Sequence, residues 1–578
     1  MKGYLLGILL LCSGHVLNAK SVSHSDIFTV ANNFLLVQTQ TGFAANTTIS
    51  DLDTLSDDDT RDILAYIFHL KPRGFLIISA DNRMQPVIAY SFRHNWQGNE
   101  KALLFQFVKK DLKLRLLRIG RDTAVHSQWN RYIRPQTITA FQQWPPEDFT
   151  QTGGWLATAW HQGDPYNQLC PLLPGTEKRS PVGCLALTLA QIINYHRYIG
   201  NCNLTPNDVY IGINLNGTRF IDADSSAFDF PSFTRLNSCL QSIRDKYKGH
   251  DTLSDNEIAA LCFTCGILTQ TQYSYNVSSA YYGSVLEVLN RKFNYYSAEF
   301  SNNITNKYPA LQENIKNGLP AIIGVASDDL TGNHALIADG YNTEDFYHLN
   351  FGWGEASPDS IVYAWYHLPR TNVRGYNIVE TMVLNIRPFN ISVSKPVLNL
   401  RGTAVGSQTN PQSLRISTNS KSEINIEKIE TSEHFFIYRD GLLINSLENI
   451  NLTADIPLSL DIVCQPDSIG MFKGSLSLTI DNEPAGMMYK YTSLIAFGIP
   501  DNGTDVDSIA SHTVWSKQNS PYCVCTSISV ASGYQLEIMP GAEVLFMDAC
   551  SLKIEDGGKI IARGSEKTPI DFHPLNGT

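Results

Sequence analysis

Cysteine is scarce in this chain, at 11 of 578 residues, a density far below that of a disulfide-stabilised scaffold. Basic tracts are missing too, and 55 acidic residues outnumber 44 basic ones, which argues against nucleic acid or an anionic membrane surface as a partner. With 43% hydrophobic and 17% charged residues the chain can bury large cores, so extensive disorder is excluded. Its length predicts about four domains.

Long apolar runs are confined to the N-terminus. Met1–Lys2 gives a positive start, Tyr4–Cys12 is apolar, and Val16–Ala19 forms a cleavage site of small residues. The run is shorter than the ~20 residues of a spanning helix, so residues 1–19 are predicted to be a signal peptide. We expect an exported protein, secreted or at the cell surface, in a compartment where disulfides are allowed.

The remaining chain divides into regions that differ in their pattern of expected helices, strands and turns. Residues 20–141 are expected to be a mixed α+β unit, with strands over 74–80 and 87–91 and a helix within 100–122. Paired prolines and glycines in residues 142–154 predict an exposed, extended linker open to proteolysis. Residues 155–388 mix helices and strands. Residues 396–499 alternate strands and turns without a helix, as in a β-sandwich, and residues 500–578 are β-rich.

Cys184 follows Gly183 at the start of a predicted buried helix over 183–198. A thiol near the exposed N–H groups of a helix start favours the thiolate form. For a single cysteine, a buried structural role is the ordinary alternative. Cys184 alone therefore indicates little.

His334 and Asn350 strengthen the case for a catalytic role of Cys184. His334 lies 150 residues downstream (334 − 184) and Asn350 lies 166 residues downstream (350 − 184). A cysteine followed at this distance by histidine and asparagine is the papain-like order. In that chemistry the histidine takes the thiol proton and later protonates the leaving amine, while the asparagine orients the ring. A core histidine is the alternative.

Gln162 precedes the cysteine by about twenty residues. Its amide can donate to a developing oxyanion beside the backbone N–H of Cys184. Taken singly it would be an ordinary surface residue, and only its order before Cys184, His334 and Asn350 makes it a candidate.

These segments resemble the streptopain-like C10 family of papain-like cysteine peptidases. The resemblance rests on three motifs, Trp160-x-Gln162 with Pro165–Asn167, Gly183-Cys184-x-Ala186 with Ala190–Ile192, and His334-Ala335 with the stretch 346–354. It implies a papain-like domain over 155–388, a supporting Gly183, and a Trp353 that shelters the Asn–His hydrogen bond. Departures are Asn333 in place of glycine, Phe351 in place of tryptophan, and bulky Leu187 and Leu189.

The flanking regions also resemble known modules. Residues 74–81 and 86–91 resemble the family's inhibitory pro-domain, which implies a zymogen with a pro-domain over 20–141 and an activation linker over 142–154. Residues 466–478 resemble an Ig-like sandwich strand pair, and residues 540–572 the opening of a β-solenoid. Cys262-x-x-Cys265 has no accompanying ligands, so we expect no metal and no cofactor.

The sequence therefore predicts an α+β cysteine endopeptidase followed by all-β modules, acting on proteins or peptides, inhibited by its own pro-domain and binding no nucleic acid. Two alternatives stay open. One is an acyl transferase on a papain-like fold, and the other is an inactive or adhesive surface protein with a relic peptidase fold. Attachment to the cell surface through the C-terminal β modules is also left open against free release.

Overall fold

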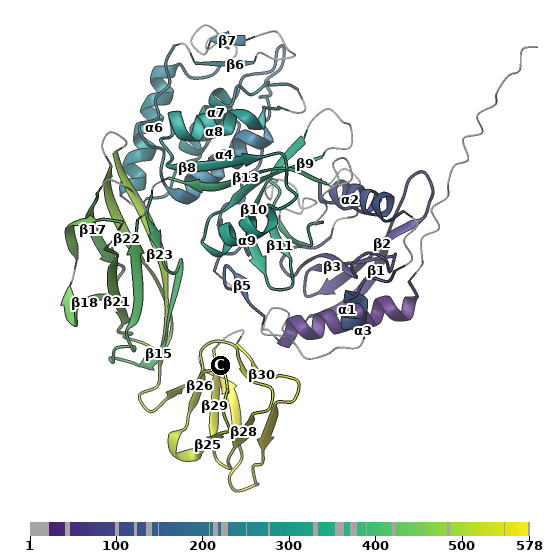
Figure 1. Cartoon of the computed structure of the whole chain (residues 1–578), viewed down its shortest axis with the longest axis vertical. Coiled ribbons are helices and arrows are strands. Elements are labelled where there is room, and N and C mark those ends of the chain that lie inside the picture. Colours follow the sequence, from purple (N-terminus) through teal and green to yellow (C-terminus); the bar gives the residue numbers. More distant parts are fainter. Residues whose placement is uncertain are drawn as a thin grey trace, which may run out of the picture.

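The structure is a computed structural model. It describes residues 22–40, 47–96, 98, 103–120, 124–133, 141–147, 149–206, 208–211, 218–220, 229–249, 251–275, 278–326, 333–352, 363–369, 378–388, 390–418, 423–444, 446–454, 456–482, 486–547 and 550–575. The predicted signal peptide lies outside this range. Figure 1 shows a mixed helix-and-strand body, a sheet-rich module beside it and a smaller β module at the C-terminal end.

The N-terminal unit is an antiparallel sheet with helices on both faces. Its strands are β1 (Thr48–Ser56), β2 (Ile63–Lys71), β3 (Phe75–Ser79) and β4 (Val87–Ser91), and its helices are α1 (His24–Gln40), α2 (Leu103–Ile119) and α3 (Gln128–Ile133). Strand alternation sends Leu76 and Ile78 toward α1, and Phe75 and Ile77 toward α2. The strands and helix expected here from the sequence are confirmed.

This sheet continues without a break into the peptidase region. Strand β4 pairs with β12 (Tyr363–Tyr366), and the order runs β1-β2-β3-β4-β12-β11-β10-β9-β13-β8. The remaining members are β8 (Ser297–Ser301), β9 (Ala321–Ala326), β10 (Asn333–Asn342), β11 (Tyr347–Asn350) and β13 (Val379–Arg387). The two regions therefore share backbone hydrogen bonds as well as a core.

Helices cover the sheet in the peptidase region. They are α4 (Cys184–His196), α6 (Phe233–Lys248), α7 (Asp255–Leu268), α8 (Val285–Glu287) and α9 (Tyr308–Lys316), with short turns η2 (Tyr282–Ser284) and η3 (Val288–Lys292) and the hairpin β6 (Val209–Ile211) and β7 (Thr218–Phe220). Helix α4 is buried along most of its length and packs between α7 and β10. It begins at Cys184, as the sequence predicts.

The middle module consists of two facing sheets. One has the order β14 (Ser392–Val393), β16 (Gln412–Ser417), β21 (Leu458–Cys464), β18 (Phe435–Arg439) and β19 (Leu442–Ile444). The other has the order β15 (Val397–Ala404), β23 (Gly486–Ile499), β22 (Gly470–Asn482), β17 (Ile424–Thr431) and β20 (Leu447–Leu452). Buried side chains such as Leu414, Ile426 and Leu478 alternate inward, which confirms the predicted pattern of strands without helices.

The C-terminal module is built from parallel ladders. The first joins β24 (Thr504–Asp505), β26 (Tyr522–Val524), β29 (Glu543–Phe546) and β32 (Asp571–Pro574), and the second joins β25 (Thr513–Trp515), β28 (Gln535–Ile538) and β31 (Lys559–Ala562). The third joins β27 (Ile528–Val530) to β30 (Leu552–Ile554), and η4 (Lys517–Asn519) connects strands. In the part of the chain that is described, no helix is long and apolar enough to cross a membrane.

Candidate active site

Cys184 occupies the first position of α4, directly after Gly183. Gly183 has φ 92°, and a Cβ there would lie 3.1 Å from the carbonyl oxygen of Ser278. Glycine is therefore required for both the backbone angle and the close approach. The tight turn directs the first N–H groups of α4 toward the cysteine, where the helix dipole favours negative charge.

His334 at the start of β10 is coupled to Cys184. Burial alone would raise the pKa of the Cys184 thiol, but the charge of His334 and a hydrogen bond with it bring the pKa below its usual value of 9.0. Burial likewise opposes the charged form of His334, yet the negative sulfur raises the pKa of His334 above 6.5. The two pKa values shift in opposite directions, and each shift favours the charged form of its group.

The partner on the far side of the imidazole differs from the expected one. The Nε2 atom of His334 lies 3.3 Å from the backbone carbonyl oxygen of Phe351, which accepts its hydrogen bond. The side chain of Asn350 was expected to fill this role, and it points elsewhere. A backbone carbonyl thus orients the ring where the papain-like pattern has an amide.

Asn350 instead fixes the turn that carries this carbonyl. Its Oδ1 accepts the N–H of Gly352 at 2.9 Å, and its Nδ2 donates to the carbonyl of Thr158 at 3.2 Å and to Oε1 of Gln191 at 3.3 Å. The Thr158 hydroxyl donates to the same Gln191 oxygen at 2.8 Å. Because Gln191 lies on α4, this buried cluster joins the cysteine helix to the loop after β11.

The main chain of Gln162 is hydrogen-bonded to the segment that leads into the nucleophile. Its carbonyl accepts the N–H of Val182 at 3.0 Å, two residues before Cys184, and the residue is half-buried. Trp160 stacks on Tyr166 with ring centroids 5.8 Å apart, which fixes the neighbouring chain. Trp353, the remaining candidate from the sequence, lies outside the described residues.

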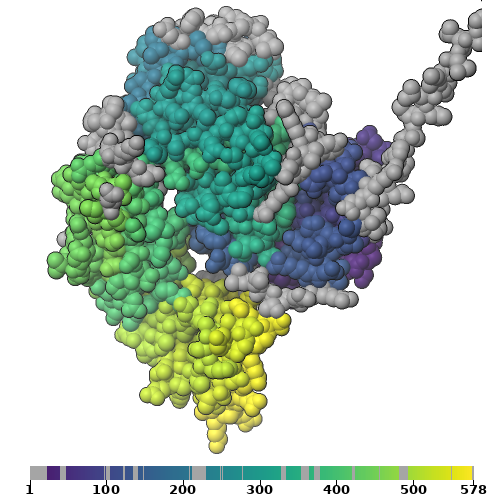
Figure 2. All heavy atoms as spheres, in the orientation of Figure 1, coloured from purple at the N-terminus to yellow at the C-terminus, as the bar shows by residue number. Residues whose placement is uncertain are grey.

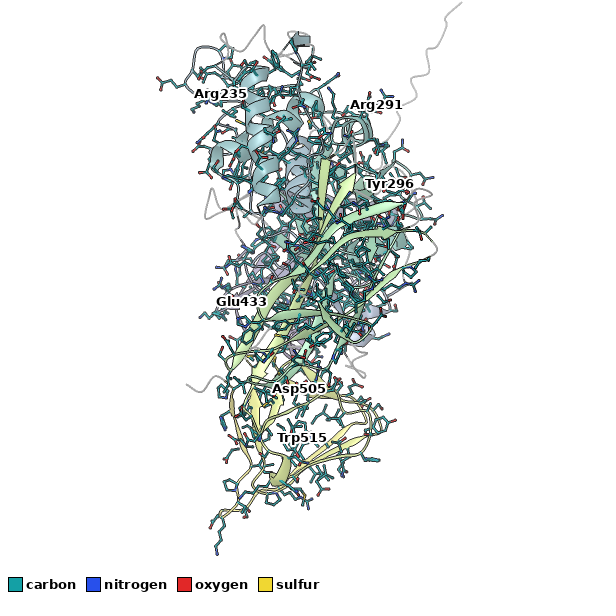
Figure 3. The ribbon with its side chains drawn as sticks, turned by 90° about the vertical axis from the view of Figure 1, so that its left-hand side faces the viewer. Arg235, Arg291, Tyr296, Glu433, Asp505 and Trp515 are labelled. Carbon is teal, nitrogen blue, oxygen red and sulfur yellow. The ribbon has the colours of Figure 1, made fainter. Side chains whose placement is uncertain are left out.

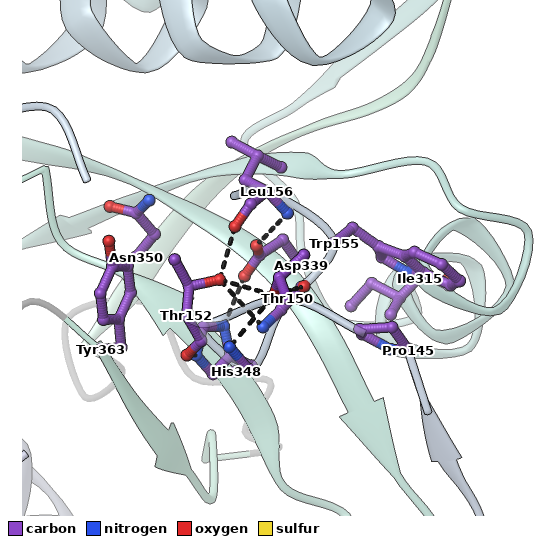
Figure 4. A network of polar contacts seen from close by, with 12 residues as sticks. Pro145, Thr150, Thr152, Trp155, Leu156, Ile315, Asp339, His348, Asn350 and Tyr363 are labelled. Atoms are coloured by element: carbon purple, nitrogen blue, oxygen red, sulfur yellow. Dashed lines mark hydrogen bonds and ion pairs between the residues drawn. The ribbon is translucent and has the colours of Figure 1, made fainter. Parts of the chain in front are cut away.

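A second buried network lies under the same sheet (Figure 4). The Nδ1 atom of His348 is 2.6 Å from Oδ1 of Asp339, and its Nε2 is 2.9 Å from the carbonyl oxygen of Thr152. Both partners offer hydrogen-bond acceptors, so the ring is held from both sides. The other Asp339 oxygen accepts the N–H of Leu156 at 2.9 Å, and a Cβ on Gly154 would collide with this carboxylate.

This network corrects the expectation of an open linker. Within residues 142–154, β5 (Gln143–Trp144) pairs with β10, and the segment from Thr152 to Leu156 is hydrogen-bonded to Asp339 of β10 and His348 of β11. Pro145, Thr152 and Gly154 are buried. Proline and glycine predict a local absence of helix, but they do not predict that a distant strand will bind the segment.

The N-terminal unit reaches the site through α2. The ring of Phe107 makes an edge contact with Phe351, with centroids 5.6 Å apart. Near it, buried Arg115 pairs with Asp111 at 2.6 Å, and Asp111 accepts the hydroxyl of Tyr366 at 2.5 Å. Arg115 also donates to the carbonyl of His367 at 2.6 Å. The helix therefore contacts the residue whose carbonyl orients His334.

Sequence reasoning missed Gln191, Thr158 and the Phe351 carbonyl as parts of the site. Gln191 and Asp339 stand within the recognised motifs, so only their roles were unassigned. A backbone carbonyl carries no signal in residue type. Among the described residues no group of His, Cys, Asp and Glu could hold a metal ion, and the ten cysteines described are free thiols.

Comparisons with known proteins identify two regions of the chain. Residues 160–359 match the model of the Peptidase C10 family, and residues 19–115 match that of the Spi protease inhibitor. Streptopain of Streptococcus pyogenes is 23% identical over 357 residues, covering 56% of this chain and 80% of streptopain.

Two further relatives extend the comparison. The thiol protease/hemagglutinin PrtT of Porphyromonas gingivalis is 23% identical over 368 residues, which cover 61% of this chain and 40% of PrtT. A solved fragment of Prevotella intermedia prointerpain A is 20% identical, covers 58% of this chain and 97% of that fragment, and has a TM-score of 0.39. The chain thus contains a cysteine-type peptidase domain that matches the C10 family, preceded by a domain that matches the Spi protease inhibitor.

Proposed function

We propose that the protein is an exported cysteine endopeptidase, made as a zymogen and hydrolysing peptide bonds in proteins. The observation that carries the proposal is the coupling of Cys184, at the start of α4, with His334 on β10, which lowers one pKa and raises the other. A thiolate held beside an imidazolium is the resting state that thiol peptidases need.

The proposed reaction runs through these groups in turn. The Cys184 thiolate attacks the peptide carbonyl carbon, and the new oxyanion receives hydrogen bonds from the backbone N–H of Cys184 and the amide of Gln162. His334 gives its proton to the leaving amine, so the C–N bond breaks and an acyl-enzyme remains. Water, deprotonated by His334, then releases the acid product and restores the thiolate.

Substitution of the pair tests the assignment. Cys184→Ala and His334→Ala should each abolish turnover of a peptide substrate, and the double variant should be no worse, because the two groups act as one unit. Thermal unfolding of each variant serves as the folding control. Near-normal turnover in either single variant would exclude the pair as the catalytic centre.

Gln162→Ala separates the oxyanion role from substrate binding. Loss of one oxyanion donor costs ~10²–10³ in kcat, so kcat should fall strongly while KM changes little. A raised KM with unchanged kcat would make Gln162 a substrate-binding residue.

Latency is proposed to come from residues 20–141. The contact of Phe107 with Phe351 and the buried Asp111–Arg115 pair against β12 support it, since they hold α2 beside the His334 acceptor. Isolated 20–141 added to mature enzyme should inhibit reversibly, and the Phe107→Ala version should inhibit less. Equal activity of uncleavable precursor and mature enzyme on one small peptide would contradict the proposal.

The remaining regions receive roles by resemblance. Residues 1–19 are proposed to direct export, and residues 142–154 to be the activation linker. The facing sheets of 396–499 support an Ig-like sandwich, and the parallel ladders of 500–578 support the start of a β-solenoid. Both modules are proposed to be accessory, with the chemistry confined to 155–388.

A further inference from the structure

The linker has a second neighbour besides the peptidase sheet. On one side Trp144 and Gln143 pair with Tyr341 and Asn342 of β10, and Trp144 stacks on Tyr341 with centroids 6.2 Å apart. The N–H of Thr343 donates to the Gln142 carbonyl at 2.9 Å. This side of the segment is therefore closed by backbone pairing.

On the other side lies a cavity of about 650 Å³. Its walls come from three regions: Phe141, Gln143 and Phe149 of the linker, Met471 and Leu494 of the sandwich, and the stretch 525–529 with Lys553 of the C-terminal module. A peptidase must enclose an extended stretch of its substrate in its own cleft. The cavity is far too small to admit a separate peptidase domain, so the linker cannot be bound by one from this side.

Hydrogen bonds hold together the cavity wall that is formed by the sandwich and the C-terminal module. Arg401 of β15 donates through Nε to Asp505 at 3.1 Å and through Nη1 to Thr526 at 3.2 Å, and it also bonds the carbonyl of Val506. Asp505 lies where the sandwich meets the C-terminal module (Figure 3). A small apolar core also crosses this junction, formed by Phe497, Ile499, Cys523, Cys525, Leu545, Met547 and Leu575.

The sandwich in turn is seated on the peptidase domain. A Cβ on Gly318, in the turn after α9, would lie 3.3 Å from Cβ of Pro396, and buried hydrophobic residues of the two domains belong to one cluster. Figure 2 shows the C-terminal module, in yellow, against the lower end of the sandwich and below the peptidase body. Domains joined by such contacts do not separate freely.

We propose that the sandwich and the C-terminal module shield one side of the linker stretch 141–147, and that this stretch is cut faster once the C-terminal module moves at the Arg401 junction. The proposal rests on the proposed function in one respect, since it takes 142–154 as the activation linker. A binding event on the C-terminal module that opens the junction would then expose this side of the linker, which couples activation to what the accessory modules bind.

The test uses full-length Cys184→Ala precursor and an added glutamyl endopeptidase. Glu147 is the sole glutamate between residues 141 and 156, so a fragment starting after it reports linker access directly. Glu177, in an exposed loop of the peptidase domain, is the internal control. This readout needs no activity of the chain itself, so failure of the proposed function would not alter it.

Arg401→Ala should speed cutting after Glu147 by on the order of tenfold, because cutting follows the population of the open form and several hydrogen bonds to a charged group are lost. Arg439→Ala is the matched control, since Arg439 pairs with its neighbour Asp440 at 3.8 Å. Cutting after Glu177 should stay unchanged in both. New cuts inside residues 500–575 would reveal an unfolded module rather than an opened one.

A variant with a disulfide across the junction tests the opposite effect, slower cutting, and its oxidised and reduced forms can be compared in one protein. A Cβ at Gly402 would lie 3.2 Å from Cβ of Asp505, close to the ~3.5–4.5 Å of a disulfide. In Gly402→Cys/Asp505→Cys, the oxidised form, verified by mass, should be cut after Glu147 several-fold more slowly than the reduced form. Equal rates in oxidised and reduced protein, or equal rates in Arg401→Ala and Arg439→Ala, would overturn the proposal.

Discussion

Replacing Asp339 by asparagine should loosen the segment 150–156 from the peptidase sheet. In the structure one Asp339 oxygen is 2.6 Å from the His348 ring and the other accepts the N–H of Leu156 at 2.9 Å, and both side chains are almost fully buried. An asparagine amide offers one acceptor and one donor. One of the two buried donors therefore loses its partner.

The loss of stability expected from Asp339→Asn follows from the burial of the pair. Leaving a buried donor without its partner costs about 1–3 kcal/mol. A domain of this size loses about 2–4 °C of melting temperature per kcal/mol, so the transition that contains this network should fall by roughly 5 °C. Asp229→Asn is the matched control: its exposed pair with Arg179, at 2.7 Å, should be worth less than about 1 kcal/mol.

Two assays on the Cys184→Ala background measure the effect. Calorimetry gives the shift of the transition, and hydrogen exchange of a peptide spanning 150–157 reports whether the Leu156 amide is still protected. Adding His348→Gln to Asp339→Asn should cost less than the sum of the two single changes, since both changes remove the same hydrogen bond. Unchanged exchange together with a shift no larger than that of Asp229→Asn would refute the role given to this pair.

Three other predictions concern the site and its frame. Burial would raise the pKa of Cys184, but the charge of His334 and a hydrogen bond with it lower this pKa below 9.0, so the onset of Cys184 alkylation by iodoacetamide should move to higher pH in His334→Ala; an unmoved onset would separate the two groups. Gln191→Met leaves Asn350 without one acceptor and should lower kcat by up to ~10²-fold, with unfolding temperature as control; unchanged kcat would refute its positioning role. Burial would raise the pKa of Glu257, but hydrogen bonds from Lys246, Ser242 and Ser254 lower it to about 2, so its stabilisation is full above pH 4.5 and is lost as pH falls toward 2; the melting-temperature gap between parent and Glu257→Gln should shrink over that range, and a constant gap would contradict the linkage.

The sequence was most informative where chemistry and local pattern coincide. Gly183 before an apolar helical stripe predicted that α4 begins at Cys184, and buried β-branched runs predicted β3, β4 and β9. Those features depend on neighbours within a few residues. Local propensity therefore sufficed.

Long-range pairing was beyond local pattern. The docking of Trp144 on β10 depends on Tyr341, almost two hundred residues later, and the shared sheet depends on Tyr90 meeting Trp365. The acceptor for His334 is a backbone oxygen, present at every residue, so only the turn held by Asn350 determines that it lies there. Composition cannot encode either arrangement.

The most direct test of the account is the site of labelling by an epoxysuccinyl peptide, a thiol-directed peptidase inhibitor, after activation. The account predicts one adduct per molecule, on Cys184, with activity lost in proportion to labelling, and little labelling of uncut precursor. The other cysteines in the peptidase domain include Cys170, Cys202 and Cys262, all buried with raised thiol pKa values, and they should stay unmodified. Full activity after complete labelling of Cys184, or inactivation with the adduct on another residue, would contradict the assignment of Cys184 as the nucleophile.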